Sequence, residues 1–207
     1  MFNDAINKTA KEALAILSNI KELNSFYLAV GTGLTIQIGH RISYDLDFFS
    51  FNTFDLDYTI YSITKAINFT NITTSENTLR GFYNDCEISF FLYKYPLLSK
   101  QAEFMNIKVA SIKDIALMKL IAIGGRGLKK DFYDIYFIIK GYIPLKEIIN
   151  CFDDKYRVGR FNKFHYIKSL TYFDLADEDD SNLNLLTDVS WDDVKSYIYT
   201  QSLKILE

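Results

Sequence analysis

Two aspartates in a short alternating segment are the residues best spaced for chemistry. Polar and apolar residues alternate through Tyr44–Ser50, which predicts a strand with Asp45 and Asp47 on one face, roughly 6.5–7 Å apart along the chain. Neighbouring carboxylates repel each other unless a cation lies between them. Carboxylate oxygens are ligands that Mg²⁺ prefers, so the pair predicts a metal site. A solvated strand edge is the alternative interpretation.

A glycine turn precedes the aspartate pair. The apolar run Phe26–Val30 predicts a short buried strand that ends at the turn Gly31-Thr32-Gly33. A short helix is predicted next, over Leu34–Ile38, and Gly39 suits its C-terminus. Backbone N–H groups at the start of a helix favour negative charge. The turn is therefore a candidate for holding a triphosphate through backbone N–H groups and the Thr32 hydroxyl.

A second group of candidate residues lies in the later half of the chain. Lys119 and Arg126 fall on one side of a predicted helix, whereas Lys113 faces another direction. A lysine among apolar residues can extend its ammonium group to solvent and have no function. Asp131 and Asp134 begin the next predicted helix, where capping is an ordinary role for an aspartate.

Several ordered blocks of sequence carry a resemblance to a known family. They resemble the AbiEii/AbiGii family of nucleotidyltransferase-like toxins, in its short members, and they cover most of the chain. The blocks are the Gly-Thr turn at residues 31–32, His40–Phe49, Ser111–Lys119, Arg126–Tyr136, Lys168–Asp174 and Trp191–Val194.

The resemblance implies a nucleotidyltransferase that moves a nucleoside monophosphate from an NTP to an acceptor hydroxyl. Mg²⁺ or Mn²⁺ would be the cofactor, RNA such as tRNA the acceptor, and a DNA-binding antitoxin the partner in a toxin–antitoxin or phage-defence pair. It also implies that Gly31 and Thr32 hold the triphosphate and that Asp45 and Asp47 bind the metal.

The same resemblance extends to the helical half of the chain. It implies that Lys119 and Arg126 neutralise phosphate charge. Asp134 would support the acceptor side, either by orienting one of these cations or by acting as a base towards the incoming hydroxyl.

One position departs from the pattern that the resemblance leads us to expect. A third acidic residue is usual on a later strand, and the matching position here is Ser89, with Glu87 two residues away on the same strand face. Glu87 could serve as the ligand from a displaced position, or the site could operate with Asp45 and Asp47 alone. Because of Ser89, the chain could also be a catalytically silent nucleotide-binding module that acts through protein interaction. A third hypothesis is transfer to a protein hydroxyl instead of RNA, since the site chemistry would be the same.

The periodicity of the remaining chain predicts an α/β (α+β) fold with a mixed sheet flanked by helices, followed by a helical C-terminal half. We expect a core at residues 1–110 and a helical region packed on it at 111–207. An amphipathic pattern occupies Met1–Ile20. Strands are predicted at 68–74, 78–83 and 87–93, and helices at 56–67 (capped by Asp55), 112–123, 131–139, 145–150, 161–170 and 191–205.

Charge is unevenly distributed along the 207 residues. Thr171–Asp193 holds eight acidic residues and no Lys or Arg; subtracting these eight from the 26 acidic residues leaves 18 against 23 basic ones, a net charge of +5 elsewhere. Such a body can hold a phosphate backbone weakly, and the acidic stretch is expected to be a solvated loop. The basic and aromatic mixture at residues 155–168 would suit nucleic acid, but an ordinary amphipathic helix is preferred.

Cysteine content and hydropathy bear on the compartment. Cys86 and Cys151 form no disulfide framework, and both are expected to be buried thiols. No apolar run has the length of a membrane span, and the N-terminal pattern differs from that of a signal peptide. These features predict a cytoplasmic protein with no membrane partner.

Overall fold

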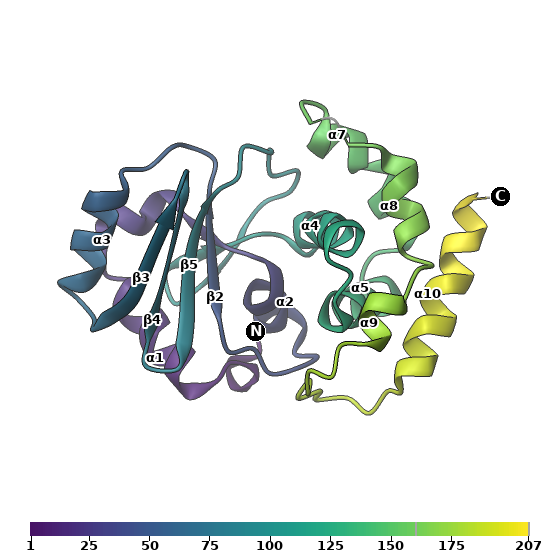
Figure 1. The fold of residues 1–207 in the computed structure, drawn as a ribbon, viewed down its shortest axis with the longest axis horizontal. Helices are drawn as coiled ribbons and strands as arrows, with labels where there is room; N and C mark the ends of the chain where they lie inside the picture. Colours follow the sequence, from purple (N-terminus) through teal and green to yellow (C-terminus); the bar gives the residue numbers. More distant parts are fainter. Residues whose placement is uncertain (160, 207) are drawn as a thin grey trace. The chain divides into compact units, whose positions relative to one another are not determined.

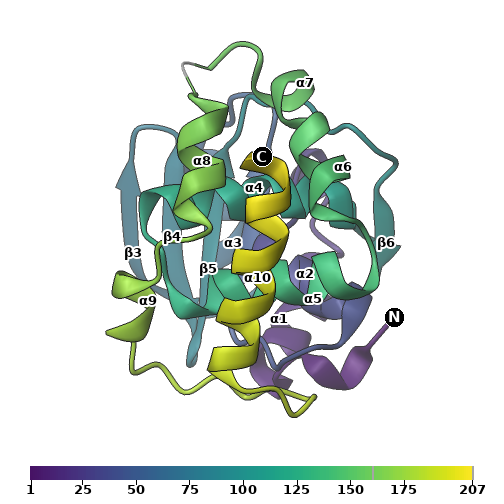
Figure 2. The same ribbon diagram turned by 90° about the vertical axis from the view of Figure 1, so that its right-hand side faces the viewer.

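The computed structural model describes residues 1–159 and 161–206, shown in Figures 1 and 2. The chain divides into two units, described in turn. The first comprises Met1–Pro96 with Lys100–Ser111, and the second comprises Leu97–Ser99 with Ile112–Glu207.

A mixed sheet of seven strands organises the first unit. The strand order is β3-β4-β5-β2-β1-β7-β6. The two central strands β2 and β5 run parallel, β1 is antiparallel to β2 and parallel to β7, and the remaining neighbours are antiparallel. The strands are β1 (Tyr27–Leu28), β2 (Leu46–Ser50), β3 (Phe69–Ser75), β4 (Thr78–Tyr83), β5 (Cys86–Leu92), β6 (Ala102–Phe104) and β7 (Ile107–Val109).

Helices cover both faces of this sheet. Figure 1 shows α1 (Lys8–Leu17) and α3 (Leu56–Thr64) on one side and α2 (Val30–Ile38) on the other. The 3₁₀ turns η1 (Asn3–Ala5) and η2 (Lys21–Ser25) flank α1.

Local chemistry explains where two of these helices begin or end. The Asp55 side chain accepts a hydrogen bond from the backbone N–H of Tyr58 at 2.9 Å and so caps α3. Gly39 ends α2 at φ 63, a left-handed conformation that costs glycine little. Both of these helix signals were predicted from the sequence, and both are confirmed.

The two faces of the sheet differ in composition. On the α1 side, alternate residues of the strands are fully buried and form one apolar core, which includes Leu28, Leu46, Phe48, Ile88 and Phe90. The residues between them point to the opposite face. Because side chains alternate along a strand, the side chains of Asp47 and Ser89 lie on that opposite face.

The second unit is entirely helical within its described residues. Among its helices, α4 packs on α5, α6 and α8, and α10 lies across α5, α6 and α8, as Figure 2 shows. The helices are α4 (Ile112–Gly125), α5 (Lys129–Gly141), α6 (Leu145–Asn150), α7 (Phe152–Tyr156), α8 (Lys163–Ser169), α9 (Asp174–Asp177) and α10 (Trp191–Leu206).

A buried ion pair ties the short segment Leu97–Ser99 to this helical unit. Lys155 Nζ lies 2.8 Å from Asp114 Oδ1, and both side chains are fully buried. The same carboxylate accepts the backbone N–H groups of Leu98 at 2.9 Å and Ser99 at 3.2 Å. Burial lowers the pKa of Lys155, although the hydrogen bond to Asp114 opposes that shift. Lys155 therefore belongs to the core, not to a nucleic-acid surface.

The predicted fold class is confirmed: a mixed sheet with flanking helices is followed by a helical half. Three predicted strands agree within one or two residues, and the helix over 145–150 agrees at both ends. The strands β6 and β7 and the short helices α7 and α9 were not predicted. The strand predicted over Tyr44–Ser50 begins only at Leu46, so Asp45 precedes it.

Several smaller expectations need correction or comment. Cys86 is fully buried as expected, but Cys151 is only half-buried. Arg160, within the basic and aromatic mixture, lies outside the described residues. No helix in residues 1–159 or 161–206 is long and apolar enough to cross a membrane.

The buried pair generates a stability prediction. Lys155→Met removes the cation and leaves the Asp114 carboxylate buried without its ammonium partner, so we expect the free energy of unfolding to fall by about 3–5 kcal/mol. Urea denaturation monitored by circular dichroism measures this. The control is Lys163→Met, at a pair with Asp153 whose side chains are 36% and 68% exposed, where a loss under about 1 kcal/mol is expected. Equal losses in both variants would contradict the assignment.

Candidate active site

The glycine turn forms the first turn of α2. The helix begins at Val30, four residues before the predicted Leu34, so the expected loop between strand and helix is wrong. Val30 itself has φ 45, which is unusual for a β-branched residue. The strained residue lets the chain pass from β1 into α2 with almost no connection. The backbone N–H groups of Gly31 and Thr32 thus lie at a helix N-terminus, where negative charge is favoured.

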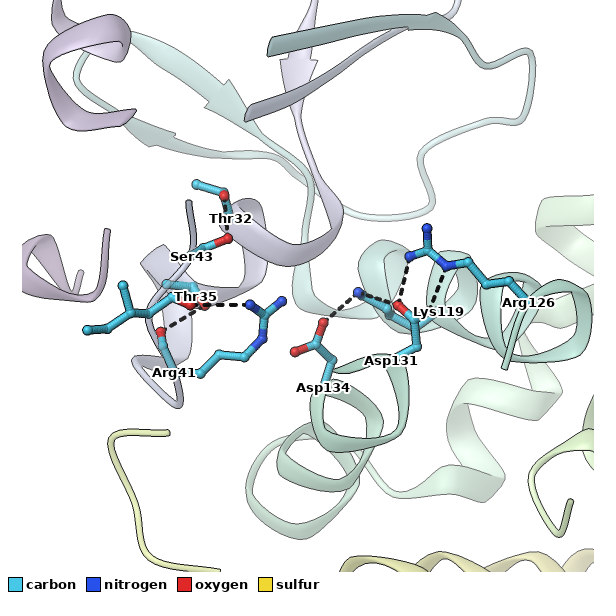
Figure 3. Close-up of polar contacts among 9 residues, drawn as sticks. Thr32, Thr35, Arg41, Ser43, Lys119, Arg126, Asp131 and Asp134 are labelled. Atoms are coloured by element: carbon cyan, nitrogen blue, oxygen red, sulfur yellow. Dashed lines mark hydrogen bonds and ion pairs between the residues drawn. The ribbon is translucent and has the colours of Figure 1, made fainter. Parts of the chain in front are cut away.

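Thr32 links this turn to the aspartate pair. Its hydroxyl is buried and donates to the backbone carbonyl of Asp45. It also shares a hydrogen bond of 2.7 Å with the Ser43 hydroxyl (Figure 3). We expected the hydroxyl to approach a triphosphate, and that contact stays a prediction. In the structure Thr32 instead fixes the backbone at Asp45.

Arg41 lies against the same turn; the sequence placed it in a motif of the family resemblance but assigned it no role. A Cβ atom added to Gly31 would come within 2.7 Å of Arg41 Nη2, so the guanidinium packs directly over the glycine. The Arg41 side chain is buried and donates to the carbonyl of Ile42 at 3.3 Å, and the Thr35 hydroxyl donates to the carbonyl of Arg41 at 3.2 Å. Glycine at position 31 therefore permits a cation to lie against the helix start.

The aspartate pair lies where β2 begins. Asp45 is exposed just before the strand, and Asp47 is half-buried within it. Asp47 pairs in register with Ser89 of β5, which is 3% exposed, so the serine side chain is next to the carboxylate. Glu87 precedes Ser89 by two residues on β5 and therefore lies on the same face. It is half-buried, and its Oε1 lies 3.9 Å from Arg80 Nη1.

The thiol of Cys86 reports negative charge at this end of the sheet. Burial, as the largest cause, and nearby carboxylates together raise its pKa to about 12. The thiol is therefore protonated and unreactive at neutral pH. The carboxylates that act on it are, in order of effect, Asp45, Asp85, Asp47 and Glu87.

Magnesium is the metal that the sequence leads us to expect at the aspartate pair. Among the residues that the structure describes, no group of three His, Cys, Asp or Glu side chains is placed to hold a metal ion. Mg²⁺, however, is commonly held by one or two carboxylates plus substrate phosphates. Asp45 and Asp47, with the Ser89 hydroxyl beside them, supply oxygen donors only. This donor set fits a magnesium ion whose remaining ligands come from a substrate.

A buried cluster of charges occupies the second unit. Lys119 Nζ lies 2.8 Å from Asp131 Oδ1 and 2.5 Å from Asp134 Oδ2 (Figure 3). The Lys119 side chain is 2% exposed and both carboxylates are fully buried. Arg126 is different because half of its side chain is exposed. It donates through Nε to Asp131 Oδ2 at 2.8 Å and through Nη2 to Oδ1 at 3.1 Å, a bidentate pair.

Asp131 is the member of this cluster whose role the sequence misidentified. It was expected to cap a helix, but α5 begins at Lys129 with Leu128 at the N-cap position. Burial by itself would raise the pKa of Asp131. The charge of Lys119 and the hydrogen bonds from Arg126 outweigh burial and hold the pKa below its usual value. The carboxylate is thus an anion that orients two cations.

The structure therefore distributes the expected site residues between two groups. Gly31, Thr32, Asp45 and Asp47 come together in the first unit. Lys119, Arg126 and Asp134 come together in the second unit, and Asp134 contacts Lys119 as expected. The residues missed were Arg41, Ser43 and Asp131. The sequence did hold a signal for the pairing of Asp131 with Arg126: the two residues are five positions apart, and Gly127, at φ 56, ends the helix between them.

Comparison with known proteins identifies the family. A curated protein of Aquifex aeolicus strain VF5, described as uncharacterized protein aq_aa25, is 36% identical over 211 residues, 98% of each chain. The family model described as "Nucleotidyl transferase AbiEii toxin, Type IV TA system" matches residues 92–193. The chain belongs to the AbiEii family of nucleotidyl transferase toxins. The matched segment of this AbiEii protein contains the buried charge cluster of Lys119, Arg126, Asp131 and Asp134. The glycine turn and the aspartate pair precede this segment.

Solved structures agree with the fold of the AbiEii protein. Two are from Helicobacter pylori: one has a TM-score of 0.56, 15% identity and coverage of 96% of this chain and 95% of the other. The second, JHP933, has a TM-score of 0.53, 16% identity and coverage of 97% and 93%. MenT4, a nucleotidyltransferase toxin of Mycobacterium tuberculosis H37Rv, has a TM-score of 0.55 at 14% identity, with coverage of 95% and 86%.

The buried cluster generates a prediction about Lys119. Lys119→Met leaves two carboxylates buried without their shared ammonium group, so we expect the free energy of unfolding to fall by about 3–5 kcal/mol in urea denaturation. The matched control is Lys113→Met, whose ion pair with Glu147 is partly exposed and should matter by less than about 1 kcal/mol. A Lys119 variant as stable as the control would refute the assignment. Because a destabilised variant would also lose nucleotide binding, binding by Lys119 variants has to be compared with their stability.

A second prediction concerns acid stability. The pKa of Asp131 is lower in the folded state than in the unfolded chain, so its contribution to stability is present above about pH 4 and is lost as pH falls through the folded-state value. Asp131→Asn lacks this contribution. Thermal melts from pH 7 to pH 3 should show a large gap between wild type and variant at neutral pH, and the gap should narrow below about pH 4. A gap that stays constant with pH would contradict the charge assignment.

Proposed function

We propose that this AbiEii protein transfers a nucleoside monophosphate from an NTP to an acceptor hydroxyl on RNA, such as tRNA. The bond between the α- and β-phosphates breaks, and pyrophosphate leaves. The observation that carries the proposal is the hydrogen bond from the Thr32 hydroxyl to the carbonyl of Asp45. This bond connects the N-terminus of α2, where a phosphate can bind, to Asp45, whose carboxylate can bind a metal ion. Family membership supports the reaction class.

In the first unit, the backbone N–H groups of Gly31 and Thr32 bind triphosphate oxygens at the start of α2. The carboxylates of Asp45 and Asp47 would hold Mg²⁺ or Mn²⁺. Such an ion neutralises phosphate charge and makes an acceptor hydroxyl easier to deprotonate. The residues themselves act by positioning and by charge, which are the main requirements of nucleotidyl and phosphoryl transfer.

In the second unit, Arg126 is the cation best placed to meet a substrate. Its bidentate contact with Asp131 uses two N–H groups, and half of the side chain is exposed, so the guanidinium is accessible to a phosphate. Lys119 is buried between two carboxylates and acts through them. We assign Lys119 to positioning Asp134, which then supports the acceptor side of the reaction.

The biological role that we propose is that of a toxin paired with a cognate antitoxin, in a toxin–antitoxin or phage-defence pair. The body of the chain outside Thr171–Asp193 carries a net positive charge, which favours a nucleic-acid acceptor. The acidic segment contacts basic residues of its own unit. Lys195 Nζ lies 3.0 Å from Asp177, and the Lys129 backbone N–H donates to Asp179 at 3.0 Å.

A catalytically silent nucleotide-binding module is the second candidate, and the observation that favours it is Ser89. The serine occupies the strand position beside Asp47 where a third carboxylate was expected. Fewer carboxylates would weaken metal binding. A silent module would bind NTP without transferring label, and a protein-modifying enzyme would label protein instead of RNA.

A transfer assay tests the proposal. Incubation of the full chain with Mg²⁺, each α-labelled NTP in turn and total RNA should label RNA, and the double variant Asp45→Asn with Asp47→Asn should reduce labelling to background. The double variant should melt within a few degrees of wild type, because removing two neighbouring like charges relieves repulsion. Wild-type rates in the double variant would refute the metal assignment, and label on protein alone would refute an RNA acceptor.

A further inference from the structure

A row of side chains crosses the sheet on the face that carries Asp47. Asp47 on β2 is in register with Ser89 on β5, and Ser89 is in register with Arg80 on β4. Residues in register on neighbouring strands point to the same face. Arg80, Ser89 and Asp47 therefore form one line across three strands.

The contacts of Arg80 establish which face it occupies. Its guanidinium carbon lies 5.4 Å from the ring centroid of Phe91, and its Nη1 lies 3.9 Å from Glu87 Oε1. Glu87 and Phe91 flank Ser89 at intervals of two residues on β5. Leu79, the strand neighbour of Arg80, is fully buried in the core on the other face. The guanidinium thus lies on the face of the aspartate pair.

The space between Arg80 and Asp47 is occupied by a small residue. Adjacent strands lie about 4.8 Å apart, so two strand spacings of roughly 10 Å separate the backbones of Arg80 and Asp47. Ser89 lies between them and is too short to fill this interval. A polyphosphate held at Asp47 would come within reach of a long arginine side chain that extends over the serine.

The ion pair of Arg80 with Glu87 contributes little to the stability of the fold. Its side chain is 53% exposed, that of Glu87 is 36% exposed, and their separation of 3.9 Å is beyond hydrogen-bonding distance. Exposed pairs of this kind contribute little to folding. Stacking on Phe91 and attraction to Glu87 nevertheless hold the guanidinium over this face.

We propose that Arg80 is a substrate-binding residue that contacts the polyphosphate of the NTP. A third carboxylate on β5 would add an anionic ligand for metal cations, whereas Ser89 adds none. Arg80 lies on the strand next to Ser89 and supplies a permanent positive charge there. The N–H donors of its planar guanidinium suit phosphate oxygens. This inference rests on the proposed function, because it needs an NTP bound at the aspartate pair.

Calorimetry with the full chain tests the proposal, with NTP and inorganic tripolyphosphate as probes in the presence of Mg²⁺. Arg80→Met should weaken binding of both probes roughly tenfold or more, the size of one lost charge-assisted contact. Arg80→Lys should recover part of that loss, because lysine keeps the positive charge but lacks the paired N–H donors of the planar guanidinium. Melting should stay within a few degrees of wild type.

Two further variants sharpen the outcome. Lys108→Met is the matched control: Lys108 is an exposed basic residue of β7 in the same sheet that donates to the Asn24 carbonyl at 3.1 Å, and its loss should leave probe binding unchanged. Glu87→Gln should tighten binding modestly, because it removes a negative charge beside the bound phosphate. A loss with Glu87→Gln equal to that of Arg80→Met would identify Glu87 as the ligand and overturn the proposal.

The remaining outcomes separate this inference from the function on which it rests. If wild type binds NTP and Arg80→Met binds it equally well, Arg80 is only half of a cross-strand pair and the inference is wrong. Weakened NTP binding with unchanged tripolyphosphate binding would also overturn it, since the contact would then lie with the nucleoside. If wild type binds no NTP, the proposed function fails as well.

Discussion

The parallel pairing of β2 with β5 is the constraint on which the first unit depends. Five consecutive residue pairs, from Leu46 with Ile88 to Ser50 with Leu92, fix the register. Since side chains alternate, this register buries Leu46 and Phe48 in the core and simultaneously directs Asp47 to the opposite face. A slip of one residue would exchange these faces and bury the carboxylate. Burial of apolar side chains on one face therefore holds the functional groups of the other.

The start of α2 depends on the same strand. The backbone N–H of Ala29 donates to the carbonyl of Asp47 at 3.1 Å, so β1 remains paired up to the residue before the helix. The chain then has to turn at once, and Val30 does so at φ 45, a conformation that costs of order 1–3 kcal/mol. Complete burial of Leu34 and Ile36 offsets this strain. The result is a helix N-terminus held close to the start of β2.

In the second unit, buried charges constrain α4 from two directions. Asp114 near its start pairs with Lys155 of α7, and Lys119 further along pairs with two aspartates of α5. A buried charge without its partner is strongly destabilising, so each pair selects one arrangement of the helices that carry it. Asp131 also binds the exposed Arg126. The same contacts that order α4 and α5 thus hold a half-exposed guanidinium at the surface.

The sequence by itself determined the features that depend on local chemistry. The Asp55 cap, the left-handed Gly39 and the three strands between residues 68 and 93 follow from residue type and periodicity, and ordered motifs were enough to identify the family. The strands β6 and β7 escaped prediction because three residues carry too little periodic signal, and they exist through pairing with each other and with β1.

Only the tertiary structure decided which distant residues meet. Asp131 resembled a helix cap in sequence, but it contacts Lys119 twelve positions away because two helices pack together. The early start of α2 was hidden because Val30 adopts a conformation that its residue type disfavours. The line of Arg80, Ser89 and Asp47 arises from strand register. The short turn between Tyr83 and Cys86 fixes the register of β4 on β5. The register of β2 on β5 depends on packing of the core, because these two strands lie far apart in the chain.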